Sequence, residues 1–322
     1  MLDNVLLFAK VLDEKNGATE YSQLNKIEST TNPIWFHFDA NHSDALTAIQ
    51  QTFSDIDEYT LQAIFDQDAR PRTLQLDSGI LIILRGINHN EGDEPEDMVA
   101  VRLWVSEKRL ISLQYRKSKA LMQVSESINT HRGPKTIGDI VTSISAKVFD
   151  YIEGSIGLLD ERMDLIESRI LDEPDKQLRQ DISEIRKSAI MLRRYIAPQK
   201  EAISQLRYSD TNLFSAKNLR RIQESQDTLL RGIEDLDAIR ERSQIVKDEL
   251  VNALSDKLNR NLYVISVITA IFLPLGFLTG LFGINIGGMP GVDKEMAFTI
   301  FAACLTAIVV IQIILFKYFK WF

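Results

Sequence analysis

The chain has 322 residues, which fits roughly two to three domains, and its formal net charge at neutral pH is -8. Hydrophobic residues make up 45% of it and charged residues 25%, averages that would suit a soluble protein. It has no basic patch of the kind that binds nucleic acid, and its single cysteine, Cys304, excludes an intramolecular disulfide.

Residues 1–133 alternate between strand and helix patterns, which is typical of an α+β domain. Apolar and β-branched runs predict strands at Val5–Val11, Ile34–Phe38, Gly79–Ile87, Val99–Val105 and Arg109–Tyr115. Helical patterns fall near Ser43–Phe53 and Asp57–Phe65. Because the last three strands follow one another directly, we expect an antiparallel meander within a mixed sheet that helices cover.

Residues 134–261 carry helical patterns only and predict a long helical stalk. Apolar residues recur there at alternating steps of three and four, the repeat of a coiled-coil seam. The two seams consist of Ile156, Leu159, Met163, Ile166 and Ile170, and of Leu178, Ile182, Ile185, Ala189, Leu192 and Ile196. The stretch Asp172–Asp175 predicts a tight connection between two antiparallel helices, and Pro198 should kink or end the second.

A further helix is predicted from about Ser215 to Phe282, since no stop signal precedes Pro274. So long a helix, polar in its first part, needs partners, and the unpartnered seams favour self-association.

Residues 262–322 contain two segments without any Asp, Glu, Lys, Arg or His, Leu262–Phe282 and Met296–Phe316. At about 1.5 Å of rise per residue, each is long enough to cross the roughly 30 Å hydrocarbon core of a bilayer. We therefore predict a transmembrane domain with two helices and an outer loop at 283–295. Two buried core helices are the alternative.

The orientation follows from the positive charges beside these spans. Lys and Arg flank the cytoplasmic ends at Lys247, Lys257, Arg260, Lys317 and Lys320, whereas the loop has only Lys294. The N-terminal stretch lacks the features of a signal peptide. By the positive-inside rule, both termini face the cytoplasm and the protein lies in the cell (inner) membrane.

Polar and small residues form one helical stripe along the first span and the turns before it. The stripe consists of Asn252, Asp256, Asn259, Leu262, Ser266, Thr269, Leu273, Gly276 and Gly280. Two helices per chain cannot enclose an aqueous path, so a polar route needs several copies around one axis. The stripe therefore predicts a pore lining, and the alternative is a helix-packing face of small residues.

The end of the first span is Gly283-Ile284-Asn285 and leads into a glycine-dense turn. The amide oxygen of Asn285 suits a divalent cation that arrives with its water shell, because such ions lose water reluctantly. A ring of these oxygens would hold the ion weakly enough to release it. This triplet is thus a candidate outer ion filter, with Asn285 as a metal contact through water; a helix C-cap is the alternative.

Acidic residues of the stalk can attract cations towards the cytoplasmic end of the predicted path. They are Asp237, Glu241, Asp248, Glu249 and Asp256, of which Asp256 and Glu249 are weak candidates for metal contact. The alternative is a solvated helix face that pairs with Arg240, Arg242 and Lys247.

Zinc ligands in proteins are mainly His and Cys, and this sequence supplies few of them. None of His37, His42, His89, His131 and Cys304 has a zinc-binding spacing, so each is interpreted as an ordinary surface or core residue. The sequence therefore predicts no bound cofactor, and it favours a hydrated cation that is held transiently.

Several segments together resemble one known family. They are FLPLGFLTGLFGIN at 272–285, two C-terminal spans with a short loop, and the basic aromatic tail KYFKWF. These features resemble the CorA superfamily of divalent-cation transporters, whose hallmark is Gly-x-Asn after the first span, commonly Gly-Met-Asn. Here the triplet is Gly-Ile-Asn. With NIGGMPG after it, LRRYIAPQ at 192–199 and Arg70-Pro71-Arg72, the chain resembles the zinc-transport branch.

The resemblance implies a homopentameric funnel in the lipid bilayer, with the chain itself and divalent cations as partners. It implies that Gly283, Ile284 and Asn285 form the outer filter and that Asn259, Thr269, Leu273 and Gly276 lie on the pore wall. The magnesium branch has methionine and threonine at the places of Leu273 and Gly276, so a gating role there is not carried over.

Three functions remain open from the sequence, and none is enzymatic, because the chain shows no nucleotide-binding loop and no nucleophile constellation. The first is uptake of Zn²⁺, with proton coupling as the zinc branch suggests. The second is a Mg²⁺, Co²⁺ or Ni²⁺ channel on the same fold. The third is a membrane-anchored coiled-coil scaffold or sensor, which would need neither the filter nor the stripe.

Overall fold

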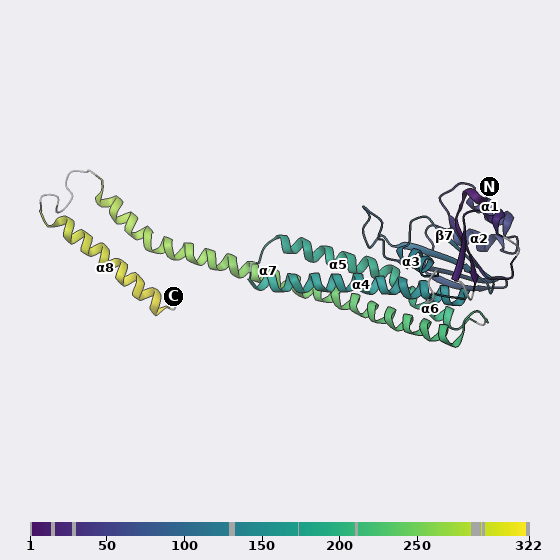
Figure 1. The fold of residues 1–322 in the computed structure, drawn as a ribbon. Coiled ribbons are helices and arrows are strands. Elements are labelled where there is room, and N and C mark those ends of the chain that lie inside the picture. Colours follow the sequence, from purple (N-terminus) through teal and green to yellow (C-terminus); the bar gives the residue numbers. More distant parts are fainter. Residues whose placement is uncertain are drawn as a thin grey trace. The chain divides into compact units, whose positions relative to one another are not determined.

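The computed structural model describes residues 2–13, 17–27, 30–128, 133–172, 174–209, 212–284, 291 and 294–319. The chain divides into two compact units, Met1–Asp248 and Glu249–Phe322. The first unit holds a β-sheet and most of the helices, and the second holds the end of a long helix and the last helix (Figure 1). This arrangement confirms the predicted fold class of an α+β domain, a helical stalk and two apolar C-terminal helices.

A seven-stranded mixed sheet, in the order β2-β1-β3-β7-β6-β5-β4, forms the base of the first unit. Its strands are β1 (Leu6–Asp13), β2 (Gly17–Tyr21), β3 (Ile34–Asp39), β4 (Arg72–Leu76), β5 (Gly79–Gly86), β6 (Val99–Val105) and β7 (Arg109–Gln114). Neighbouring strands are antiparallel except β3 and β7, which run parallel. The predicted meander of β5, β6 and β7 is confirmed.

Two of these strands, β2 and β4, escape prediction from the sequence, and they form the two edges of the sheet. Each pairs on one side only, and the side chains of β2 are half-buried or exposed. An edge strand therefore lacks the continuous apolar run that marks an inner strand.

Helices cover both faces of the sheet. On one face, α1 (Ala45–Thr52) and α2 (Glu58–Phe65) bring Ile49 and Leu61 into a core with Phe36 and Trp104, as the helical patterns predict. On the other face lie the first part of α4 (Ile137–Asp172) and α6 (Gln199–Arg207), and α3 (Lys119–Ser127) packs against α4. Because both faces are covered, β5 and β6 are almost entirely buried.

The two stalk seams pair with each other inside one chain. Every residue of both predicted seams is buried, and α4 packs along α5 (Gln177–Ile196). Pro198 separates α5 from α6, as predicted.

The helix α7 (Ala216–Phe282) continues through Pro274 without interruption, also as predicted. In the first unit it binds the other stalk helices through arginines. Arg193 of α5 donates to both carboxylate oxygens of Asp237, at 2.7 and 3.0 Å. Arg242 donates to three carboxylates on one face of α4, those of Asp160, Asp164 and Glu167.

These contacts correct one expectation from the sequence. The stalk seams and the polar part of α7 find their partners within a single chain, so they do not by themselves call for self-association. The sequence could not show this, because a seam pattern does not identify the helix that packs against it.

A buried amide joins the stalk to the sheet. Gln199 at the start of α6 is fully buried; its Nε2 donates to the Arg85 carbonyl and its Oε1 accepts from the Arg85 amide, both at 3.0 Å. Strand β4 begins at Arg72, opposite Ile83, and does not reach Arg85. The side chain of Gln199 thus takes the place of a strand partner for β5.

His37 is a core residue of β3, in agreement with its interpretation from the sequence. Its Nδ1 lies 2.8 Å from the Ser112 hydroxyl and its Nε2 lies 3.1 Å from the Gln114 side-chain oxygen. Burial lowers the pKa of His37 from 6.5 to about 4, although the contacts with Gln114 and Ser112 act in the opposite direction.

We expect the folded protein to lose stability as the pH falls from 6.5 towards about 4, the two pKa values of His37. In this window the unfolded chain binds a proton at His37 that the folded chain does not, so the free energy of unfolding decreases by up to about 1.4 kcal/mol per pH unit. Thermal unfolding of the purified protein from pH 7 to pH 5 measures the slope. His37→Gln, whose amide stays neutral, should show a smaller slope, and equal slopes would contradict the assignment.

Candidate functional site

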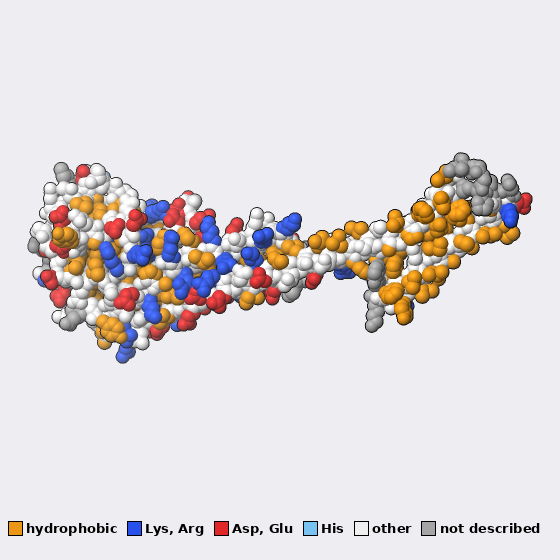
Figure 2. Space-filling view, turned by 180° about the vertical axis from the view of Figure 1, so that it is seen from behind, with side chains coloured by type: hydrophobic (Ala, Val, Ile, Leu, Met, Phe, Trp, Pro, Cys, Tyr) orange, Lys and Arg blue, Asp and Glu red, His pale blue; other side chains and the backbone are white. Residues whose placement is uncertain are grey.

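The second unit contains the end of α7 and all of α8 (Ala297–Tyr318). Both helices are long and apolar enough to cross a membrane. Figure 2 shows hydrophobic side chains over these helices, whereas Lys, Arg, Asp and Glu gather over the first unit. The observed helices coincide with the predicted spans to within one or two residues at α8.

Helix α8 contacts one face of α7. Gln312 Nε2 of α8 donates to the Ala270 carbonyl of α7 at 3.2 Å, and the rings of Phe282 and Phe301 lie 5.0 Å apart. Val267, one turn before Ala270, is only 8% exposed. The face of α7 that contains Val267 and Ala270 is therefore the one that α8 covers.

The predicted stripe lies beside that face of α7: at 3.6 residues per turn, Thr269 lies about 100° and Leu273 about 60° around the helix from Ala270, on the side away from Val267. All its members are exposed in the single chain: Asn252, Asp256, Asn259, Leu262, Ser266, Thr269, Leu273, Gly276 and Gly280. A Cβ atom added at Gly276 or Gly280 would meet no atom within 4 Å. Helix α8 thus leaves the polar face of the span available to line an interface or a path between copies.

One of the two hydroxyl groups on this stripe, that of Thr269, is oriented by the helix itself. Thr269 Oγ1 donates to the Ile265 carbonyl at 2.8 Å, so its hydrogen is engaged and its remaining lone pairs can accept. A hydrated divalent cation presents water hydrogens outward. Acceptors such as Thr269 and Asn259 can therefore contact the water shell without removing it.

The outer end of α7 is closed by a glycine. The Gly283 amide donates to the carbonyls of Thr279 at 2.9 Å and Gly280 at 3.2 Å. A Cβ atom at Gly283 would lie 2.8 Å from the Thr279 oxygen, so glycine is required for this close approach. Gly283 therefore acts as a helix cap, and Ile284 after it is exposed; Asn285 lies outside the described residues.

The acidic candidates on α7 form two groups: those near another side chain that binds them, and those that are simply exposed. Asp237 binds Arg193 and Arg240, Glu241 lies 3.8 Å from Arg240, and the hydrogen bond from Arg193 keeps the pKa of Asp237 below its usual range. Asp248 accepts from Gln244 at 3.0 Å. Glu249 and Asp256 are exposed.

This grouping corrects one predicted partner. Arg242 pairs with acids of α4 and not with the acids of α7. Within the described part of the chain, no group of three or more His, Cys, Asp and Glu side chains could hold a metal ion.

The described histidines belong to different segments of the first unit, and Cys304 belongs to the second unit. His42 is exposed, His89 packs its ring 4.7 Å from that of Tyr151, and His131 lies outside the described residues. Cys304 is exposed on α8 beside an apolar groove.

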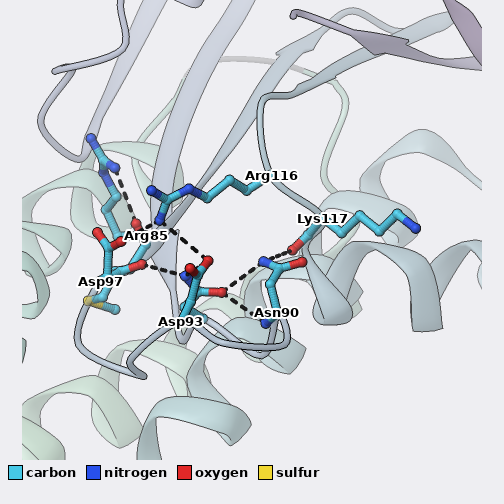
Figure 3. Close-up of polar contacts among 8 residues, drawn as sticks. Arg85, Asn90, Asp93, Asp97, Arg116 and Lys117 are labelled. Carbon is cyan, nitrogen blue, oxygen red and sulfur yellow. Dashed lines mark hydrogen bonds and ion pairs between the residues drawn. The ribbon is translucent and has the colours of Figure 1, made fainter.

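A polar cluster in the first unit has a structural role (Figure 3). Arg116 binds Asp97 and lies 3.8 Å from Asp93, while Asn90 donates to the Lys117 carbonyl at 3.2 Å. The side chain of Arg85 donates to backbone carbonyls, one of them that of Ala69 at 3.0 Å. The bonds of Arg116 and Asn90 tie the connection between β5 and β6 to the segment that follows β7, and the bond of Arg85 ties β5 to the segment before β4.

Gln312 is a site residue that the sequence patterns did not single out. The sequence does contain an indication of its importance, because a carboxamide side chain is rare in a helix as apolar as α8. Its partner is not predictable from a sequence pattern, since the two residues belong to different helices.

The fold and this site define a two-span membrane protein whose first span presents an uncovered polar face. A family model described as "CorA-like Mg2+ transporter protein" matches residues 31–320. The chain is 31% identical over 315 residues to "Zinc transport protein ZntB" of Yersinia pseudotuberculosis, covering 98% of this chain and 95% of that one. It is 30% identical over 290 residues to "Divalent cation transporter CmaX" of Pseudomonas aeruginosa, covering 89% and 87%.

The solved structure of full-length CmaX has the same fold, with a TM-score of 0.81 at 29% identity over 98% of both chains. The chain is thus an ion transporter and not an enzyme, with two C-terminal membrane spans and a cytoplasmic N-terminal body, as predicted. It belongs to the CorA-like Mg²⁺ transporter family and to its ZntB branch.

Proposed function

We propose that this chain carries zinc into the cytoplasm across the inner membrane, along a path lined by the first spans of several copies. The observation that carries the proposal is the stripe on α7, which stays exposed because α8 packs on another face of the helix. The choice of zinc is supported by the name of the relative that matches nearly the whole chain. Coupling of this uptake to protons is part of the same proposal.

Self-association is part of this proposal. Two spans cannot enclose a water-filled path, so the stripes of several chains must face one axis. We propose a ring of five chains with Gly283, Ile284 and Asn285 at its outer mouth. The polar face of α7 would then be buried between copies, in contact with water and ions and not with lipid.

The ligand chemistry supports a hydrated ion. The stripe offers amide, hydroxyl and carboxylate oxygens, which suit a divalent cation with its water shell better than a stripped zinc ion. Mg²⁺, Co²⁺ and Ni²⁺ share this shell, so the ranking of the metals is a matter for competition experiments.

Purified wild-type protein in otherwise empty liposomes should take up zinc, and native mass spectrometry of the same sample should find rings of five chains. Uptake is measured with an internal zinc indicator, with and without a pH gradient, and each of the other metals is added as a competitor. If magnesium crosses the membrane faster than zinc, the transported ion would be assigned as magnesium instead of zinc. If no metal ion crosses the membrane, the result would favour a membrane-anchored coiled-coil scaffold. If monomers transport zinc, a path lined by several chains would be excluded.

A further inference from the structure

A proline inside the first span leaves one backbone carbonyl without its helical donor. In an α-helix the amide of residue i donates to the carbonyl of residue i−4, and proline has no amide hydrogen. Pro274 therefore frees the Ala270 carbonyl, although α7 continues through this point. In a bilayer such a group cannot turn to water, so it needs a donor from the protein.

The second span supplies that donor. Gln312 Nε2 of α8 donates to the Ala270 carbonyl at 3.2 Å. Gln312 is half-buried, and its Oε1 is buried without a hydrogen-bond partner among the described residues. An apolar side chain of the same size would avoid this unpaired oxygen, so the contact with Ala270 is what favours an amide at this position.

The contact lies beside the polar stripe. Ala270 follows Thr269 in the sequence, and Pro274 follows Leu273, so each member of the contact on α7 neighbours a stripe residue. Closing the hydrogen bond sets how far α7 opens at the proline, and with it the position of Thr269 relative to Leu273 on the neighbouring stripe.

We propose that Gln312 is a positioning residue for transport: it replaces the hydrogen bond that Pro274 removes and so fixes the shape of the first span beside the stripe. The inference rests on the proposed function, because its effect on transport requires that α7 line the path. It gives the second span a role in conduction although α8 contributes no residue to the stripe.

A double-mutant cycle tests this role. Gln312→Leu removes the donor at nearly constant volume, and we expect the maximal zinc flux to fall about three- to tenfold, the range of one hydrogen bond between membrane helices. Pro274→Ala restores the backbone donor, so in that background Gln312→Leu should change the flux less than about twofold. The zinc concentration for half-maximal flux should stay unchanged, because the outer mouth is not altered.

Two further variants serve as controls for this cycle. Thr306→Val removes a hydroxyl of α8 that is used within its own helix, at 2.9 Å from the Ala302 carbonyl, and should leave the flux near wild type in both backgrounds. Gln312→Glu keeps Pro274; assayed at low pH, where a carboxyl is protonated and can donate to the Ala270 carbonyl, it should retain clearly more flux than Gln312→Leu.

Equal losses from Gln312→Leu in both backgrounds would overturn the proposal, as would a Gln312→Glu protein that is as slow as Gln312→Leu. If Pro274→Ala is itself inactive, the comparison of Gln312→Glu with Gln312→Leu decides. Zinc flux through the wild-type protein tests the proposed transport function, and its absence would contradict that function. If the wild type transports zinc but the effects of Gln312→Leu and Pro274→Ala are additive, only the role of Gln312 is contradicted.

Discussion

Replacing Asn285 with alanine should reduce zinc uptake into proteoliposomes by about tenfold or more, while the ring and its thermal stability stay near wild type. The proposed partner of Asn285 is the water shell of the ion and not another part of the fold. Loss of a hydrogen bond to a charged species is worth about 1.5–3 kcal/mol, which corresponds to roughly a 10- to 100-fold change. Uptake at saturating and limiting zinc measures the effect.

The neighbouring residue provides the control for this experiment. Ile284→Met keeps an apolar side chain of similar volume and removes no polar group, so its effect should be much milder. Gly283 is unsuitable, because a side chain there would collide with the Thr279 carbonyl. Wild-type uptake by Asn285→Ala in intact rings would remove Asn285 from the filter and leave the triplet as a helix terminus.

Gln199→Leu should destabilise the first unit by roughly 2–5 kcal/mol, because it leaves both the amide and the carbonyl of Arg85 without their partner in a buried place. The side-chain volume hardly changes, so the loss reports the two hydrogen bonds and not a cavity. The thermal unfolding midpoint of the full-length protein, followed by circular dichroism, should drop by several degrees.

A second glutamine on the same helix gives a matched comparison. Gln205 is exposed and donates to Glu201 within α6, so Gln205→Leu should change the free energy of unfolding by less than about 0.5 kcal/mol. If the two variants were equally stable, the amide of Gln199 would not be the link between α6 and β5.

Several parts of the fold follow from local pattern. The inner strands, such as β5 and β6, have apolar runs because they are covered on both faces, and the seams of α4 and α5 repeat at coiled-coil steps because they pack along each other. The edge strands β2 and β4 lack such a signal, since each is paired on one side only.

Some features of the candidate site could likewise be predicted from the sequence, and others only from the folded chain. The two spans and the polar stripe could be predicted from the sequence, because hydropathy and helical spacing are properties of consecutive residues. The folded chain was needed to learn which face of α7 the second span covers, which helix Arg242 binds, and that Gln199 and Gln312 complete the hydrogen bonding of backbone far away in the chain. A hydrogen bond between distant residues depends on how whole elements pack, and that packing leaves no periodic trace in the sequence around either partner.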